Sequence, residues 1–142
     1  MMNDSKELGR LSGGPRDDEL KVPRGAFIAF RQSGGLRFSM REVAVYNDGR
    51  VIWNRQGKLA AENGSRRISP DEVAELKELI EHSGLSALPN SIGRPSPDGY
   101  AYELIARLDR KLKVIEFFDG SIPVQLHTLL QQLKKLMTSV SE

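Results

Sequence analysis

The alternation of apolar and polar positions in the first third of the chain predicts three antiparallel strands in series. An apolar run at 26–31, rich in aromatic and β-branched residues, is followed by a polar break at 32–35 and by extended sequence at 37–46. A second break, Asn47-Asp48-Gly49, precedes apolar residues at 51–53. Asp-Gly between apolar runs is a strong hairpin signal, because glycine adopts the positive φ of such turns without steric strain. We therefore expect a three-stranded meander.

A helical period follows the meander. Apolar residues recur at spacings of three and four, which is the pattern of one buried stripe: Val73, Leu76, Leu79 and Ile80. Ser69 is a natural N-cap, Pro70 suits the first helical position, and Glu72 completes a capping box. Gly84 ends the predicted helix as a C′ glycine.

Strict alternation returns in the last third of the chain. Apolar residues occupy every second position at 100–108, a tight turn follows at Asp109-Arg110, and alternation resumes at 112–117, which predicts a second hairpin. A last helix is expected at about 122–137, capped by Ser121 and carrying the apolar stripe Leu126, Leu129, Leu130, Leu133 and Met137. These elements predict an α+β fold: an antiparallel sheet of about five strands with two amphipathic helices packed on it.

The chain is expected to hold a single domain at 25–142, preceded by a tail at 1–24. The tail has too little apolar surface to offset its ordering entropy, so we expect it to be flexible unless it folds onto a partner. Two internal segments are harder to assign. Residues 58–62 fit either a short strand or an irregular loop, and 85–99 predict a long loop whose part 90–99 forms an exposed, proline-stiffened arch.

Composition excludes several classes of function. The chain has no cysteine, so disulfides, thiolate metal sites and cysteine nucleophiles are ruled out. The net charge is only +2 and the two signs are interspersed, which argues against a nucleic-acid-binding face. No apolar run approaches the ~18 residues of a membrane span, and the first ten residues do not form a signal peptide. We expect a cytoplasmic protein without membrane insertion.

No residue pattern points to catalysis, a metal or a cofactor. The two histidines, His82 and His127, each lie near an apolar helical stripe and lack the spacing of a metal motif. Asp48 and Asp98 could be imagined as a pair of acid–base carboxylates, but each lies in an Asp-Gly turn that accounts for it. We therefore expect a protein that is not an enzyme.

Several short motifs together carry a family resemblance. In chain order they are Ser33-Gly34-Gly35, Ser69-Pro70-Asp71-Glu72, Leu76, Leu79, Gly84, Leu88-Pro89, Pro97-Asp98-Gly99-Tyr100, Tyr102, and Pro123 with Leu126, Leu129 and Leu130. In this order and spacing they resemble the emfourin family, small protein inhibitors of thermolysin-like metalloproteases. The resemblance covers about residues 26–137. Each motif is short, so the match depends on their order.

The resemblance implies a helix packed on an antiparallel sheet, no cofactor, and inhibition by loops presented to the protease cleft. On this basis the partner-binding residues are Ser33, Gly34, Gly35, Leu36 and Arg37 in the first turn, with Arg94, Pro95 and Pro97 in the arch. The chain differs from compact inhibitors of this family in its N-terminal tail and in a longer hairpin and following loop at 47–67.

Two other functions stay open from the residues themselves. A structural or adaptor subunit of a larger assembly, without inhibitory activity, would use the arch, the tail or an open sheet edge. A ligand-binding or catalytic module would need a well-formed pocket with convergent polar groups. We expect Gly34→Arg to abolish inhibition while the protein stays folded, whereas an adaptor should depend on the tail or the arch.

Overall fold

The computed structural model describes residues 22–36, 39–57 and 61–138. The predicted tail at 1–24 therefore lies outside the described residues except for its last three positions. In chain order the elements are β1 (Ala26–Gly34), β2 (Ser39–Tyr46), β3 (Arg50–Gln56), β4 (Ala61–Arg67), α1 (Pro70–His82), the 3₁₀ helix η2 (Leu85–Ala87), β5 (Ser91–Ile92), β6 (Tyr100–Leu108), β7 (Lys111–Phe118), the 3₁₀ helix η3 (Val124–Leu126) and α2 (His127–Thr138).

The described strands form one sheet in the order β4-β3-β2-β1-β6-β7-β5. Every neighbouring pair is antiparallel except β5 and β7, which run parallel. The α+β class, the three-stranded meander and the second hairpin are confirmed. The sheet is larger than the expected five or so antiparallel strands, because it has seven strands among the described residues and one pair of them is parallel.

The two strands that were not predicted carry weak sequence signals. β4 reads AENGSRR and has no apolar alternation, and β5 is only two residues long within the loop after α1. β4 forms because it continues from β3 as a hairpin partner, with Trp53 opposite Gly64. A Cβ at Gly64 would lie 2.5 Å from the Trp53 ring, so the glycine makes room for the indole. Of the ambiguous segment 58–62, residues 61 and 62 are strand and 58–60 lie outside the described residues.

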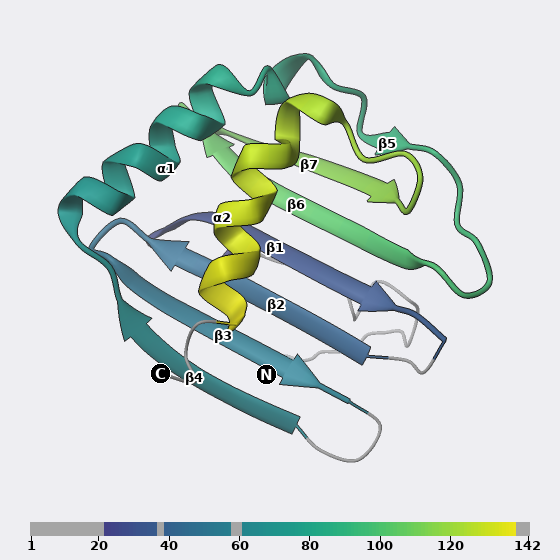
Figure 1. The fold of residues 1–142 in the computed structure, drawn as a ribbon. Coiled ribbons are helices and arrows are strands. Elements are labelled where there is room, and N and C mark those ends of the chain that lie inside the picture. The colour runs from purple at the N-terminus through teal and green to yellow at the C-terminus, as the bar shows by residue number, and fades with distance from the viewer. Residues whose placement is uncertain (1–21, 37–38, 58–60, 139–142) are drawn as a thin grey trace, which may run out of the picture.

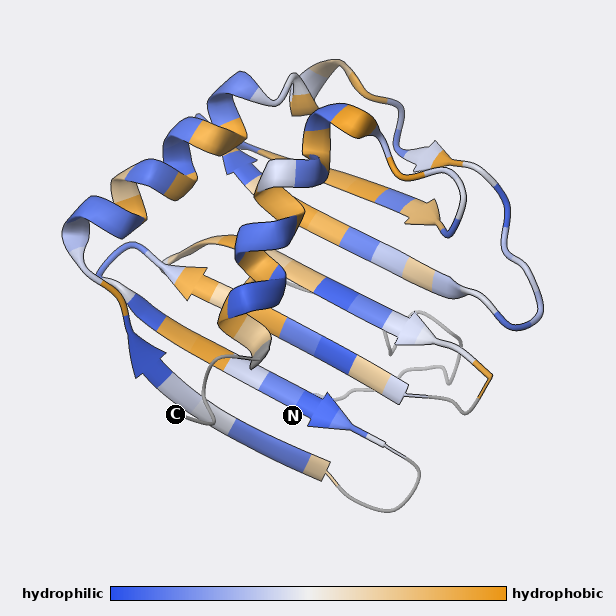
Figure 2. Ribbon diagram, viewed as in Figure 1, coloured by the Kyte–Doolittle hydropathy of each residue, from blue (hydrophilic) through white to orange (hydrophobic). Residues whose placement is uncertain are grey.

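Both long helices cover the same face of the sheet (Figure 1). α2 crosses the central strands and α1 lies beside it, and the apolar residues of both turn toward the sheet (Figure 2). The largest fully buried side chains at this junction include Phe30, Leu104 and Phe117 from the sheet and Leu126 and Leu133 from the C-terminal segment. Burial of each such side chain stabilises the fold by roughly 1.5–3 kcal/mol.

The first helix begins as its sequence predicts. Ser69 Oγ accepts a hydrogen bond from the Glu72 backbone at 3.1 Å, and Glu72 Oε1 accepts one from the Ser69 backbone at 2.9 Å, which completes the capping box. Val73, Leu76 and Ile80 are buried.

The last helix begins later than predicted. Residues 122 and 123 precede it, since Pro123 has an extended ψ of 131°, and a 3₁₀ turn follows before α2 starts at His127. The proline fits the approach to the helix, where its missing N–H leaves no bond unmade, rather than the helix itself.

The other face of the sheet is covered by none of the described helices (Figure 1). At its centre Arg31 donates to Glu42 at 3.1 Å and to Glu103 at 3.2 Å, so a cation from β1 bridges carboxylates on both neighbouring strands. None of the described helices is long and apolar enough to cross a membrane.

Candidate functional site

The predicted turn after β1 and the predicted arch meet at one end of the sheet (Figure 1). β1 pairs with β6 so that Gly34, the last residue of β1, lies opposite Tyr100, the first residue of β6. The backbone N–H of Gly35 donates to the carbonyl of Gly99 at 3.1 Å. Two segments separated by more than fifty residues of sequence are therefore joined, and we call this region the loop end: the described turn residues Gly35 and Leu36 with the arch residues 93–99.

The glycines of the turn are required by close contacts as well as by φ. Gly34 has a φ of 113°, and a Cβ there would lie 2.7 Å from the Gly99 carbonyl oxygen. Gly35 has a φ of 90°, and its Cβ would press on the Tyr100 ring at 3.0 Å. Both values of φ are unfavourable for any residue with a side chain. A side chain at position 34, as in Gly34→Arg, would meet the backbone of the arch, so this substitution would disturb the loop end itself as well as any contact with a partner.

Leu36 is the exposed apolar residue of the loop end. Its side chain is 81% exposed, more than that of any other exposed large apolar residue among the described ones. It follows Gly35, whose contacts with Gly99 and Tyr100 hold the turn in place. An exposed apolar side chain beside a fixed backbone position suits insertion into a pocket of a partner.

The remaining predicted residues take separate positions. Ser33 is half-buried within β1, paired with Met40 and Ala101, so it belongs to the strand and not to the turn. Residues of the arch are exposed at all three predicted positions: Arg94, Pro95 and Pro97. Arg37 lies outside the described residues. Among the described contacts none joins Leu36 to the arch side chains, so the two loops meet through their backbones.

Asp119 anchors the start of β6, where the arch ends, a role that the sequence analysis did not identify. Its Oδ2 accepts from the backbone N–H of Tyr100 at 2.8 Å, and its Oδ1 accepts from the Tyr102 hydroxyl at 2.7 Å. Burial, together with this hydrogen bond and the nearby carboxylate charge, raises the pKa of Tyr102 well above its usual range. The only sign of this role in the sequence was the pair Asp119-Gly120 at the end of a predicted strand. A turn accounts for that pair without any further role for the aspartate.

The other end of the arch is held by the sheet. β5 pairs with β7, and the backbone N–H of Glu116 donates to the carbonyl of Asn90 at 2.8 Å. Inside the arch, Gly99 N–H donates to the Ser96 carbonyl at 3.2 Å and closes a turn. A segment fixed at both ends and stiffened by prolines loses less entropy on binding than a free loop does.

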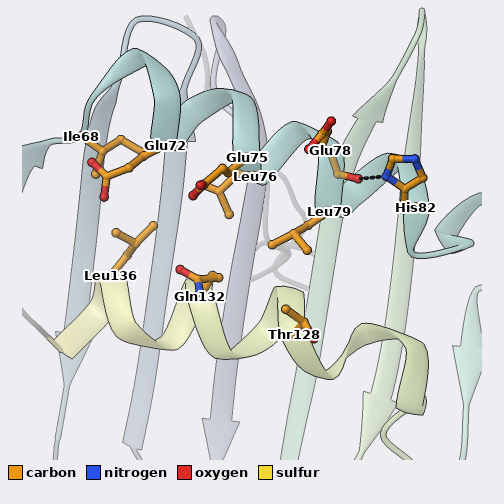
Figure 3. Close-up of a pocket in the computed structure, with 10 residues that line it drawn as sticks. All are labelled: Ile68, Glu72, Glu75, Leu76, Glu78, Leu79, His82, Thr128, Gln132 and Leu136. Carbon is orange, nitrogen blue, oxygen red and sulfur yellow. Dashed lines mark hydrogen bonds between the residues drawn. The ribbon is translucent and has the colours of Figure 1, made fainter.

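A second candidate surface, a concave one, lies between the two long helices (Figure 3). This interhelical groove encloses about 330 Å³ and is lined by Ile68, Glu72, Glu75, Leu76, Glu78, Leu79, His82, Thr128, Gln132 and Leu136. Sequence patterns assigned Leu76 and Leu79 to a buried stripe and Glu72 to a capping box. The groove exists only because the two helices pack side by side on the sheet, which neither pattern could reveal.

Neither candidate surface has the residues of a metal centre among the described residues. Within residues 22–36, 39–57 and 61–138, no three His, Asp or Glu side chains are grouped so that they could hold a metal ion. His82 uses Nδ1 in a contact with the Glu78 carbonyl at 3.0 Å in the last turn of α1. The surfaces offer shape, apolar contact and charge, which are the properties of binding sites.

No protein-family model matches this chain, and no curated protein sequence is significantly similar to it.

Proposed function

We propose that this chain is a protein-binding domain that inhibits a thermolysin-like metalloprotease by inserting its loop end into the active-site cleft. The observation that carries the proposal is the Gly35–Gly99 hydrogen bond, which joins the start of the first turn to the end of the arch. The family resemblance of the sequence motifs supplies the class of partner. The inhibitor acts without catalysis or a cofactor of its own.

The mechanism is steric occupation of a concave site by a preorganised convex edge. Leu36 enters an apolar subsite of the protease, and the exposed prolines Pro95 and Pro97 contact the rim. Because β1 pairs with β6 and Asp119 binds the Tyr100 backbone, the described residues where the two loops meet are already held in place, which lowers the entropy lost when the complex forms. Arg94, exposed in the arch, favours an acidic patch beside the cleft.

The test is a titration of the full chain into a thermolysin-like protease assay, with Leu36→Asp and Leu112→Asp compared. Both leucines are exposed, but Leu112 lies on β7, away from the turn. We expect stoichiometric inhibition by the native chain and by Leu112→Asp, and a loss of about a hundredfold or more in potency for Leu36→Asp, as for a central apolar anchor. Circular dichroism should show that both variants stay folded.

Two results would contradict the proposal. Absence of inhibition at micromolar excess rules out the proteases tested, and equal potency of Leu36→Asp removes the turn from the site. If Leu36→Asp inhibits as well as the native chain, the variant Pro95→Asp/Pro97→Asp is measured next. A loss of its potency indicates binding through the arch, and full potency indicates binding through another surface.

An adaptor role is the second candidate, and the edge strand β4 favours it. β4 is the outer strand of the described sheet on that side, and most of its residues are exposed. An extended peptide of another protein can pair with such an edge through backbone hydrogen bonds. Substitution of Ser65 by Pro on β4 would then abolish assembly and leave protease inhibition unchanged.

A further inference from the structure

We infer that the interhelical groove is a second binding surface, for a cationic amphipathic helix of a partner protein. The groove is formed by α1 and α2 and includes no residue of the loop end. This surface is therefore independent of protease inhibition, and either activity can be present without the other.

The floor of the groove is apolar. Ile68 and Leu76 are buried beneath it, while Leu79 and Leu136 are only half-buried. Leu136 lies across the groove from Ile68, and Leu79 lies across it from Thr128, toward the opposite end (Figure 3). The apolar surface that remains open on Leu79 and Leu136 becomes buried when successive aliphatic side chains of a partner enter between the helices. Such burial is the usual source of affinity in helix-in-groove recognition.

The two walls of the groove carry different charge. On the α1 wall, Glu72 and Glu75 turn toward α2, with Glu78 beyond them (Figure 3). On the α2 wall the polar residues are the neutral Thr128 and Gln132. The partner must therefore place its lysines or arginines along one edge only, the edge that lies against α1.

The carboxylates of this wall are available to a partner. Glu75 makes no ion pair or hydrogen bond through its carboxylate with any described residue, and Glu72 uses one oxygen in the capping box. Opposite charges brought together at a partly covered site favour the correct partner and exclude acidic ones.

The dimensions fit a helix. The lining residues of α1 extend from Glu72 to His82, and ten residues of helix span about 15 Å. Thr128, Gln132 and Leu136 follow at spacings of four and so form one straight wall of α2. A third helix laid between two others packs its side-chain ridges into their grooves. An extended strand would leave its backbone hydrogen bonds unmade there.

The experiment uses a fluorescein-labelled peptide of about 18 residues, long enough to form a helix, with leucines on one face and lysines along one edge. Fluorescence anisotropy measures its binding to the full chain. We expect saturable binding that weakens about tenfold in Glu72→Gln/Glu75→Gln, which removes two charges but keeps the hydrogen-bonding capacity of the cap. The matched control, Asp71→Asn/Glu81→Gln, removes two charges of α1 outside the groove lining and should weaken binding less than about twofold.

Two further peptides test the apolar part. Replacement of the peptide's leucines by serine, or of its lysines by glutamate, should abolish binding. The original leucine–lysine peptide should shift the NMR signals of the Leu79 and Leu136 methyl groups. The inference is overturned by the absence of saturable binding, by equal affinity of the serine peptide, or by equal weakening in the control variant. Leu36→Asp should bind the peptide normally, so that this result and the outcome for protease inhibition are read separately.

Discussion

Tyr102 connects the core to the loop end through a single side chain. Its ring stacks near Phe30 and Phe117, with centroids 6.2 and 5.2 Å away, and its hydroxyl donates to Asp119. A buried tyrosine keeps its proton more tightly than an exposed one, because the phenolate would have to leave water and approach the Asp119 carboxylate. The core and the start of β6 are therefore linked by a hydroxyl whose pKa lies above its ordinary value.

The raised pKa of Tyr102 gives a prediction of stability against pH. The folded state holds the Tyr102 proton above pH 10.0, the ordinary pKa, whereas the unfolded state releases it there. The contribution of Tyr102 to stability is thus complete below about pH 10 and is lost as the pH rises further. Above pH 10 the free energy of unfolding of the native chain should fall more steeply than that of Tyr102→Phe, by up to about 1.4 kcal/mol per pH unit. Urea unfolding followed by Trp53 fluorescence gives the free energy of unfolding of the native chain and of Tyr102→Phe at each pH. If the two free energies fall with the same slope above pH 10, Tyr102 does not have the raised pKa.

At the scale of elements, α1 shows how completely a helix start can be encoded locally. Ser69, Pro70 and Glu72 lie within four residues, and both reciprocal hydrogen bonds of the capping box form. These contacts satisfy backbone N–H groups that have no partner within the helix. β4 is the opposite case, since it takes its structure from its neighbour β3 and from the room that Gly64 leaves for Trp53.

Loss of the cap should destabilise the protein measurably. Ser69→Ala removes the acceptor for the Glu72 N–H and should lower the free energy of unfolding by about 1 kcal/mol. Glu72→Gln keeps an acceptor for the Ser69 N–H and should lower it by less. Urea denaturation measures both values. Equal stability of Ser69→Ala and the native chain would show that tertiary packing alone holds the start of α1.

At the scale of the whole molecule, the sheet order decides which loops can act together. β1 lies between β2 and β6, so the turn that follows β1 lies beside the arch that precedes β6. The two helices share one face of the same sheet, and the interhelical groove results from that arrangement (Figures 1 and 3). Both candidate binding surfaces are products of topology, and neither belongs to one continuous segment.

The coupling of the two loops can be tested with a matched pair of glycines. Gly34 and Gly120 both have positive φ, but a Cβ at Gly34 meets the Gly99 carbonyl at 2.7 Å whereas one at Gly120 meets nothing within 4 Å. Both Ala substitutions share the φ strain of roughly 1–3 kcal/mol. Gly34→Ala should be less stable than Gly120→Ala by about a further 1–3 kcal/mol, the effect of overpacking. Thermal unfolding measures the stability of both variants. Equal destabilisation by Gly34→Ala and Gly120→Ala would show that the arch backbone moves away from the new Cβ at negligible energetic cost.

The sequence by itself determined the elements whose signals are local. Apolar period, caps and Asp-Gly turns placed the meander, the 100–117 hairpin and α1, because each pattern reflects contacts within a few residues or across one turn. The α+β class follows from the same patterns. The exposed residues of the turn and the arch were also found in this way, since glycine and proline mark loops.

Only the tertiary structure decided how these parts combine. The short strand β5, the Asp119 anchor and the Gly35–Gly99 hydrogen bond all join segments far apart in the chain, and no local pattern encodes such pairings. It also showed why glycine is needed at position 34, where the contact is with the arch and not with the turn itself. Long-range pairing of strands sets these contacts, so the loop end and the interhelical groove appear only when the sheet is complete.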